Sequence, residues 1–193
     1  DNIRKFVKYT LSSNTGEMFV MLIGPFLGMP LPLLPLQILW INLVTDGVPG
    51  LALAVENGER GIMKRSPFHP KESIFSRGLG MQILWVGILM GLVSLGVGYF
   101  YWLRDPNGPW QTMVFTTLTL AQMGNALATR SNVDTIFKIG FLSNPLMLVA
   151  VLVTFLLQMA LIYVPFLQEF FHTEALPLND LLIALATSLI VFA

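Results

Sequence analysis

Two carboxylates, Glu17 and Asp46, stand inside runs of apolar residues, where a charge is expensive to bury. Each has polar neighbours at helical spacing: Asn14 lies three residues before Glu17, and Asn42, Thr45 and Asp46 are spaced i, i+3 and i+4. Residues three or four apart share a helix face, so carboxylate, amide and hydroxyl oxygens gather on one side of each segment. Hard cations such as Ca²⁺ prefer these oxygens as ligands.

The two segments follow one another through the short proline-rich turn MPLPLLP, which predicts antiparallel neighbouring helices. Counting about 1.5 Å per residue puts each acid roughly 15–20 Å inside its segment. The two oxygen-rich faces can therefore meet at one depth. We expect a cation site there, with local unwinding at Gly47 and Pro49, because broken helices are common at midplane ion sites.

A purely structural role is the alternative for the uncharged residues. Asn, Thr and Gln often hold membrane helices together without binding an ion. This applies to Asn42 or Thr45 taken singly and to Gln122, a further candidate ligand that shares a face with Asn125 on a later segment. It explains Glu17 and Asp46 less well, because two acids with no buried Lys or Arg need a cation or protons beside them.

Zinc and copper are not expected at this site. The chain has no Cys, and its two histidines, His69 and His172, fall in predicted loops. Thiolate and imidazole ligands are the ones that favour those metals.

The composition predicts an all-α, polytopic membrane helical bundle whose surroundings are the lipid bilayer. Of 193 residues 54% are hydrophobic and 11% charged, against roughly 25% charged in soluble domains. The net charge is zero, so no nucleic-acid partner is expected. About 20 apolar residues cross a bilayer, and six segments qualify, at approximately 6–28, 33–54, 78–102, 111–129, 145–166 and 179–193.

The basic residues predict the orientation of these spans. Lys and Arg concentrate in cytoplasmic loops, and ten of the eleven fall on alternate connections. The N-terminal end and the loops near 56–77 and 130–143 are therefore predicted to be cytoplasmic. The single basic residue on the other side is Arg104, and the ten are Arg4, Lys5, Lys8, Arg60, Lys64, Arg65, Lys71, Arg77, Arg130 and Lys138.

The chain resembles the P-type cation-transporting ATPases in three stretches, YTLSSNTGE, PLQILWINLVTDGVPGLALAVE and IMKRSPFHPKES. The closest likeness is to calcium pumps of the sarcoplasmic-reticulum and secretory-pathway type, and it covers essentially the whole chain. The resemblance implies family membrane helices five to ten of an ATP-driven pump that alternates between inward- and outward-facing states through a phosphorylated aspartate. It also implies that the segment 62–70 touches the phosphorylation domain.

The resemblance assigns ion ligands to both helices: Asn14 and Glu17 in the fifth, and Asn42, Thr45 and Asp46 in the sixth. Gln122 stands where two-ion calcium pumps carry a glutamate, and it offers an oxygen without a charge. One-ion secretory-pathway pumps lose the fifth-helix Asn and Glu that this chain keeps. The two acids supply enough negative charge for one Ca²⁺. Whether the pump moves one or two ions per cycle stays open, and so does the choice between Ca²⁺ and Mn²⁺.

The sequence has no DKTGT phosphorylation motif and no nucleotide-binding domain. We therefore expect a fragment of a parent protein, with ATP and Mg²⁺ bound only in missing domains and no catalysis by this chain alone. Its expected partners are the parent's N-terminal membrane helices and its phosphorylation domain. The short outer loops suit a bacterial plasma-membrane pump. Two other functions stay open, a monovalent-cation pump for Na⁺, H⁺ or K⁺ and a non-catalytic membrane scaffold or channel-like half-protein.

Overall fold

The structure is a computed structural model that describes residues 2–56, 58, 72–76, 78–130 and 143–192. Within these ranges all regular structure is helical and no strand occurs. The predicted all-α helical bundle is therefore confirmed. The predicted domain-contacting segment 62–70 lies outside the described residues, as do His69 and the basic residues Arg60, Lys64, Arg65, Lys71, Arg77 and Lys138.

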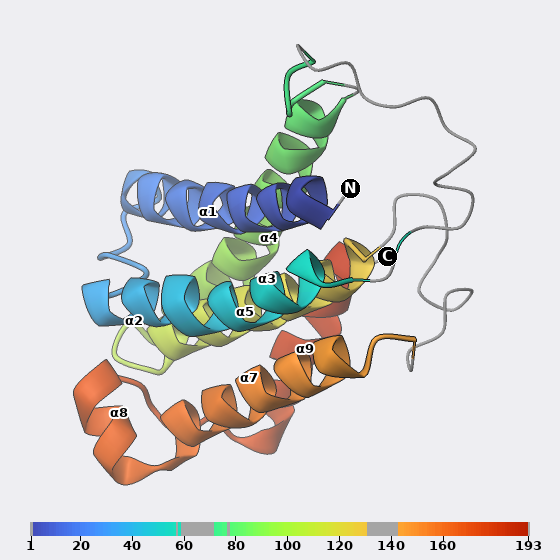
Figure 1. The fold of residues 1–193 in the computed structure, drawn as a ribbon. Coiled ribbons are helices and arrows are strands. Elements are labelled where there is room, and N and C mark those ends of the chain that lie inside the picture. Colours follow the sequence, from blue (N-terminus) through green and yellow to red (C-terminus); the bar gives the residue numbers. More distant parts are fainter. Residues whose placement is uncertain (1, 57, 59–71, 77, 131–142, 193) are drawn as a thin grey trace.

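The helices pack around a central one, α5, which contacts α1, α3, α4, α7 and α9 (Figure 1). The segments α2, η1 and α3 are consecutive parts of one broken helix, and η1 is a π-helix. The bounds are α1 Asn2–Phe26, α2 Pro35–Trp40, η1 Ile41–Thr45, α3 Gly47–Ala54, α4 Leu79–Arg104, α5 Trp110–Ala128, α7 Pro145–Tyr163, α8 Pro165–Phe171 and α9 Leu178–Phe192.

Backbone chemistry explains where the helices end. After α1 the chain turns at Gly28, whose φ of +82° suits a residue without a Cβ. The predicted segment 145–166 is divided instead at Val164, which is extended. A residue before proline disfavours the helical conformation, so Pro165 ends α7 and then starts the short α8.

Three helical segments of the described chain are long and apolar enough to cross a membrane, judged by length and composition alone. They are Pro35–Ala54, Leu79–Arg104 and Pro145–Tyr163, with mean hydropathies of 1.3, 2.0 and 2.5. The central helix α5 is not among them. Because 15 of its 19 residues are buried, it faces protein and can carry buried Thr, Gln and Asn side chains. The arrangement of six spans remains a prediction.

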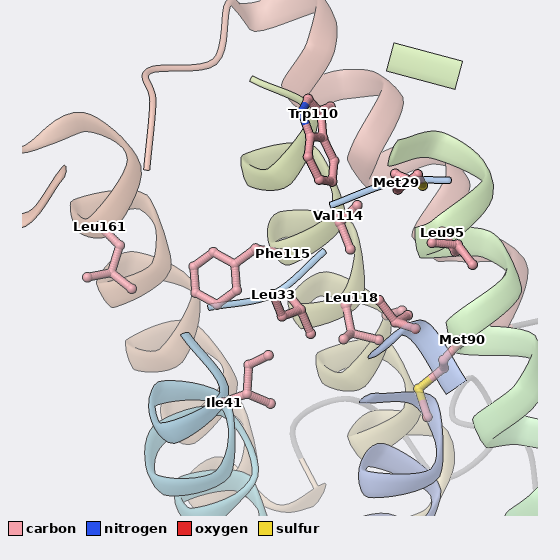
Figure 2. Close-up of a cluster of buried hydrophobic side chains, with 12 residues drawn as sticks. Met29, Leu33, Ile41, Met90, Leu95, Trp110, Val114, Phe115, Leu118 and Leu161 are labelled. Atoms are coloured by element: carbon pink, nitrogen blue, oxygen red, sulfur yellow. The ribbon is translucent and has the colours of Figure 1, made fainter. Parts of the chain in front are cut away.

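The largest apolar cluster fills the end of the bundle away from the start of α1 (Figure 2). Phe115 and Leu118 of α5 lie among side chains from the turn after α1, from η1, from α4 and from α7. Its labelled members in Figure 2 are Met29, Leu33, Ile41, Met90, Leu95, Trp110, Val114, Phe115, Leu118 and Leu161. This packing fixes Ile41, the first residue of the π-helix.

At the other end of the bundle, a buried ion pair joins three helices. Arg130 donates from Nε and Nη2 to the two carboxylate oxygens of Glu56, at 3.0 Å each. Asn144 donates to the same carboxylate at 2.8 Å and caps α7 by accepting the Met147 amide. The side chains of Arg130 and Glu56 are 0% and 4% exposed. We call Glu56, Arg130 and Asn144 the clasp.

Close approach of α1 and α4 depends on Gly87. A Cβ added there would lie 2.5 Å from the Thr15 Cβ and 2.8 Å from the Ser12 carbonyl oxygen. These atoms belong to a helix backbone and to the first carbon of a side chain, so they cannot move aside cheaply. Small residues at such crossings let membrane helices pack closely.

We expect Gly87→Ala to lower the stability of the complete protein by about 1–3 kcal/mol, the usual effect of overpacking. Gly96→Ala is the matched control, because it lies on the same helix and a Cβ there meets no atom within 4 Å. Thermal unfolding midpoints in detergent micelles measure the difference. Equal midpoints for the two variants would show that the α1–α4 approach is looser than described.

Candidate cation site

The broken helix Pro35–Ala54 carries three of the predicted ligands at its break. The break is the π-helix η1, closed by the Asp46 amide donating to the Ile41 carbonyl at 2.8 Å. Unwinding was predicted at Gly47 and Pro49, and this is wrong, since α3 begins at Gly47 and includes Pro49. The irregular backbone lies before Asp46. Single-turn π-helices often occur at functional sites.

Pro49 nevertheless shapes the site by the donor that it lacks. In a regular helix the amide of residue 49 would donate to the carbonyl of Thr45, and proline has no such hydrogen. The Tyr9 hydroxyl takes that place and donates to the Thr45 carbonyl at 2.8 Å. Tyr9 is fully buried, so α1 is joined to the break directly beside Asp46.

Glu17 lies 5% exposed between two amide donors from two other segments. Asn42 Nδ2 donates to its Oε2 at 2.9 Å, and Gln122 Nε2 donates to its Oε1 at 3.1 Å. Asn42 is itself oriented by a bond from the same Nδ2 to the Ile38 carbonyl at 2.9 Å. Three helices thus meet at one carboxylate.

Asp46 is 3% exposed, and neither of its carboxylate oxygens has a hydrogen-bond partner among the described residues. Its electrostatic neighbours are Glu17, Ser13 and Tyr9. The hydroxyls of Ser13 and Tyr9 approach it without meeting hydrogen-bond geometry, and the Tyr9 proton is directed to Thr45. Buried oxygens of this kind require a partner such as an ion, a proton or water.

Other oxygens nearby are also buried and unpartnered within the described chain. They are Ser13 Oγ, Thr45 Oγ1 and Gln122 Oε1. With the carboxylates of Glu17 and Asp46 they form a set made entirely of oxygen atoms, which suits a hard cation rather than zinc or copper. No group of three or more His, Cys, Asp or Glu side chains that could hold a metal occurs among the described residues.

The structure brings most of the predicted ligands together. Glu17, Asn42 and Gln122 are joined by hydrogen bonds, and Thr45 and Asp46 lie beside them. Gln122, predicted as a further candidate ligand with helix packing as the alternative, donates to Glu17. Asn14 lies one turn before Glu17 on α1 and is partly buried. Ion binding by these residues remains a prediction.

The expectation that the bundle would bury no Lys or Arg is wrong. Lys5 is 1% and Arg130 2% exposed. Arg130 is held by Glu56, and Lys5 precedes Glu17 by twelve residues, about 18 Å along α1. No cation is found among the groups that act on Asp46 in the described chain. Within the described chain, the two acids of the site therefore still lack a positive neighbour.

Tyr9 and Ser13 were missed from the sequence. They precede Glu17 by eight and four residues and so share its helix face. That spacing is a usable signal, because Tyr9, Ser13 and Glu17 all lie on the buried side of α1. Hydroxyl groups at this spacing from a buried acid are therefore candidates for the same site.

The chain is similar to several ATPases of known sequence. Residues 30–193 match the family described as "Cation transporting ATPase, C-terminus". The chain is 42% identical to a calcium-transporting ATPase of Bacillus subtilis (strain 168), over 98% of the chain and 22% of that relative. It is 35% identical to calcium-transporting ATPase 1 of Yarrowia lipolytica, over 94% of the chain and 20% of the relative.

A third relative is the calcium-transporting ATPase type 2C member 2 of Rattus norvegicus, 34% identical over 100% of the chain and 21% of the relative. The chain thus spans about a fifth of the length of the curated relatives that it matches. Together, the helical bundle and these matches identify the chain as a member of the cation-transporting ATPase C-terminal family.

Proposed function

We propose that this chain is the C-terminal part of the ion-translocating domain of an ATP-driven calcium pump, and that α1 and the broken helix supply ligands to the transported Ca²⁺. One observation carries the proposal: both oxygens of buried Asp46 lack a partner within the described chain and stand next to Glu17. Two acids without a nearby positive charge favour a divalent cation. The relatives named above are calcium-transporting ATPases, which supports the same ion.

Binding of Ca²⁺ would require a rearrangement of the two amides. Asn42 and Gln122 now direct their NH₂ groups to Glu17. A cation bound to Glu17 repels these donors and attracts amide oxygens, so each amide would turn about its last bond. Filling the site would thus break two interhelical hydrogen bonds at once. This gives the ion a direct means of changing how α1, η1 and α5 fit together.

The site is open on one side, where a partner helix of the parent protein would pack. Asn42 is exposed, and Leu39 and Leu43 beside it are 61% and 69% exposed. Further ligands from the parent's N-terminal membrane helices would complete the coordination of Ca²⁺, which takes six to eight oxygens. ATP and Mg²⁺ would be bound by the parent's phosphorylation and nucleotide-binding domains.

The three apolar helices and the membership of the family together identify the chain as an integral membrane protein. We propose that the start of α1 and the clasp face the cytoplasm, because ten of the eleven Lys and Arg residues fall at the N-terminal end and in the connections near 56–77 and 130–143. The Bacillus relative supports a bacterial plasma membrane as its location.

Cation competition in ATPase assays tests the choice of ion. We expect micromolar Ca²⁺ to activate ATP hydrolysis by the complete protein, as is usual for sites that sense cytosolic Ca²⁺, and Na⁺ or K⁺ to neither activate nor compete. Activation by a monovalent cation without Ca²⁺ would favour the alternative pump. Mn²⁺ is assayed in parallel, since carboxylate ligands also suit it.

The gene sequence tests the other alternative. A gene with no upstream region that encodes a DKTGT motif would favour a non-catalytic membrane scaffold or channel-like half-protein over a pump.

A further inference from the structure

The short helix α8 has three distinct faces. Leu167 and Phe171 pack against the apolar cluster of Figure 2. Phe166 and Phe170, one turn apart, are 70% and 62% exposed, and their ring centroids lie 6.3 Å apart. Glu169 is exposed along a third edge. A protein-facing side, an aromatic side and a charged edge on one short helix are typical of a helix at a membrane surface.

The helix α7, which precedes α8 in the chain, also has an exposed apolar surface. Along α7 that surface consists of Leu146, Val149, Leu152, Val153, Leu156 and Leu157, and it ends at Tyr163. The chain turns at Val164, and α8 leaves the axis of α7 at the end of the bundle (Figure 1). Because α7 is apolar enough to span a bilayer, its end marks the membrane–water interface, where aromatic residues concentrate. Lipid is therefore the occupant that this geometry favours.

The inner face of α8 is attached to the helix that carries the cation site. Phe171 packs edge-on against Trp40, with ring centroids 5.4 Å apart. Fully buried Gln37 donates from Nε2 to the Phe171 carbonyl at 3.0 Å and accepts the Leu34 amide at 3.1 Å. Trp40 directly precedes η1. The helix α8 is therefore in direct contact with the residue before the break.

We propose that α8 lies along the membrane–water interface with Phe166 and Phe170 inserted among the lipids, and that it holds the Pro35 end of the broken helix at that depth. The lipid contact of α8 rests only on the chain being an integral membrane protein. The effect on cation affinity rests, in addition, on the proposed calcium-pump function.

Spin labels on α8 test the lipid contact. A nitroxide is attached at Phe166→Cys, Phe170→Cys or Glu169→Cys, one at a time, in the complete protein in phosphatidylcholine vesicles. This chain has no Cys of its own, and any Cys elsewhere in the complete protein is first replaced by Ser. At 166 and 170 we expect faster collision with oxygen, which dissolves in lipid, than with a water-soluble nickel chelate. At 169 we expect the reverse. Preferential access of the chelate to all three positions would overturn the proposal.

The positioning role is tested with Phe166→Ser/Phe170→Ser, and Glu169→Ser is the neighbouring control. In vesicles we expect the double variant to need at least about threefold more Ca²⁺ for half-maximal ATPase activity, within the range reported for coupling through packed contacts. In detergent micelles, where there is no bilayer to seat α8, the variant and the wild type should have equal Ca²⁺ dependence. An equal shift in both media, or none in vesicles, would refute the positioning role. If the wild type itself shows no Ca²⁺ dependence, the calcium-pump proposal fails, while the spin-label result stands separately.

Discussion

Asp46→Asn is expected to raise the Ca²⁺ concentration for half-maximal ATPase activation of the complete protein by a factor on the order of a hundred or more. The substitution keeps the shape of the side chain and removes one of two negative charges beside the ion. Unit charges 4 Å apart interact by about 4 kcal/mol at an effective dielectric constant of 20, and each 1.4 kcal/mol is about a factor of ten. Because Ca²⁺ carries two charges, its interaction energy with the lost carboxylate charge is twice that between two unit charges.

Asp180→Asn is the matched control for this change. Asp180 lies at the start of α9 and accepts the Tyr101 hydroxyl at 2.6 Å, outside the cation site. The same chemical substitution there should leave the Ca²⁺ dependence as it is in the wild type. If Asp46→Asn and Asp180→Asn behave alike, Asp46 is not a ligand of the transported ion.

Loss of one clasp partner is the second substitution with a large expected effect. Arg130→Met leaves the Glu56 carboxylate buried with only Asn144 as a side-chain donor. Breaking a buried pair in this way costs about 3–5 kcal/mol, because the remaining charge is uncompensated. The double variant Arg130→Met/Glu56→Gln should lose less than the sum of the single variants, since neither charge is then left alone.

The half-life of activity at elevated temperature measures this effect, because unfolding of large membrane proteins is commonly irreversible. Arg104→Met serves as the control: Arg104 is exposed, and its guanidinium lies 4.3 Å from the centroid of the Phe100 ring. We expect a much shorter half-life for Arg130→Met than for Arg104→Met. Similar half-lives would show that the clasp adds little stability.

The clasp and the cation site are connected by the short helix α3. Asp46 precedes α3 and Glu56 follows it closely, so one rigid element of eight residues separates them. Asn2, at the start of α1, adds a hydrogen bond to the Glu56 carbonyl at 2.7 Å. One end of α3 is thus fixed by α1, α5 and α7, while its other end joins the π-helix. The contacts of the clasp therefore hold the Ala54 end of α3, whereas its Gly47 end directly follows the break.

The positions of the helices could be predicted from the sequence, because apolar length and proline spacing are local properties. Predicted segments 78–102 and 111–129 correspond to α4 and α5 within two residues at each end. The helix α8 was not separated from α7, since its seven residues continue the apolar run and only the backbone at Val164 divides them. The unwinding was predicted too late in the chain, at Gly47 and Pro49, because Pro49 marks a missing donor rather than the break itself.

The candidate site was predictable only in part, for a physical reason. Spacing along one helix predicts which side chains share a face, and on that basis Asn42, Thr45 and Asp46 were grouped as candidate ligands. It does not show which faces meet, so the bond from Gln122 to Glu17 and the contact of Tyr9 with Thr45 required the structure. Arg130 was interpreted as a loop charge, because burial of an arginine depends on a partner 74 residues away in sequence.

Equilibrium binding of radioactive Ca²⁺ to the complete protein, measured without ATP, tests the central claim most directly. It reports on the site itself and does not depend on the phosphorylation chemistry of other domains. We predict saturable, high-affinity binding to the wild type and to Asp180→Asn, and no saturable binding in this concentration range for Asp46→Asn combined with Glu17→Gln. Binding that survives unchanged in the double variant would contradict the assignment of Glu17 and Asp46 as ligands of the transported ion.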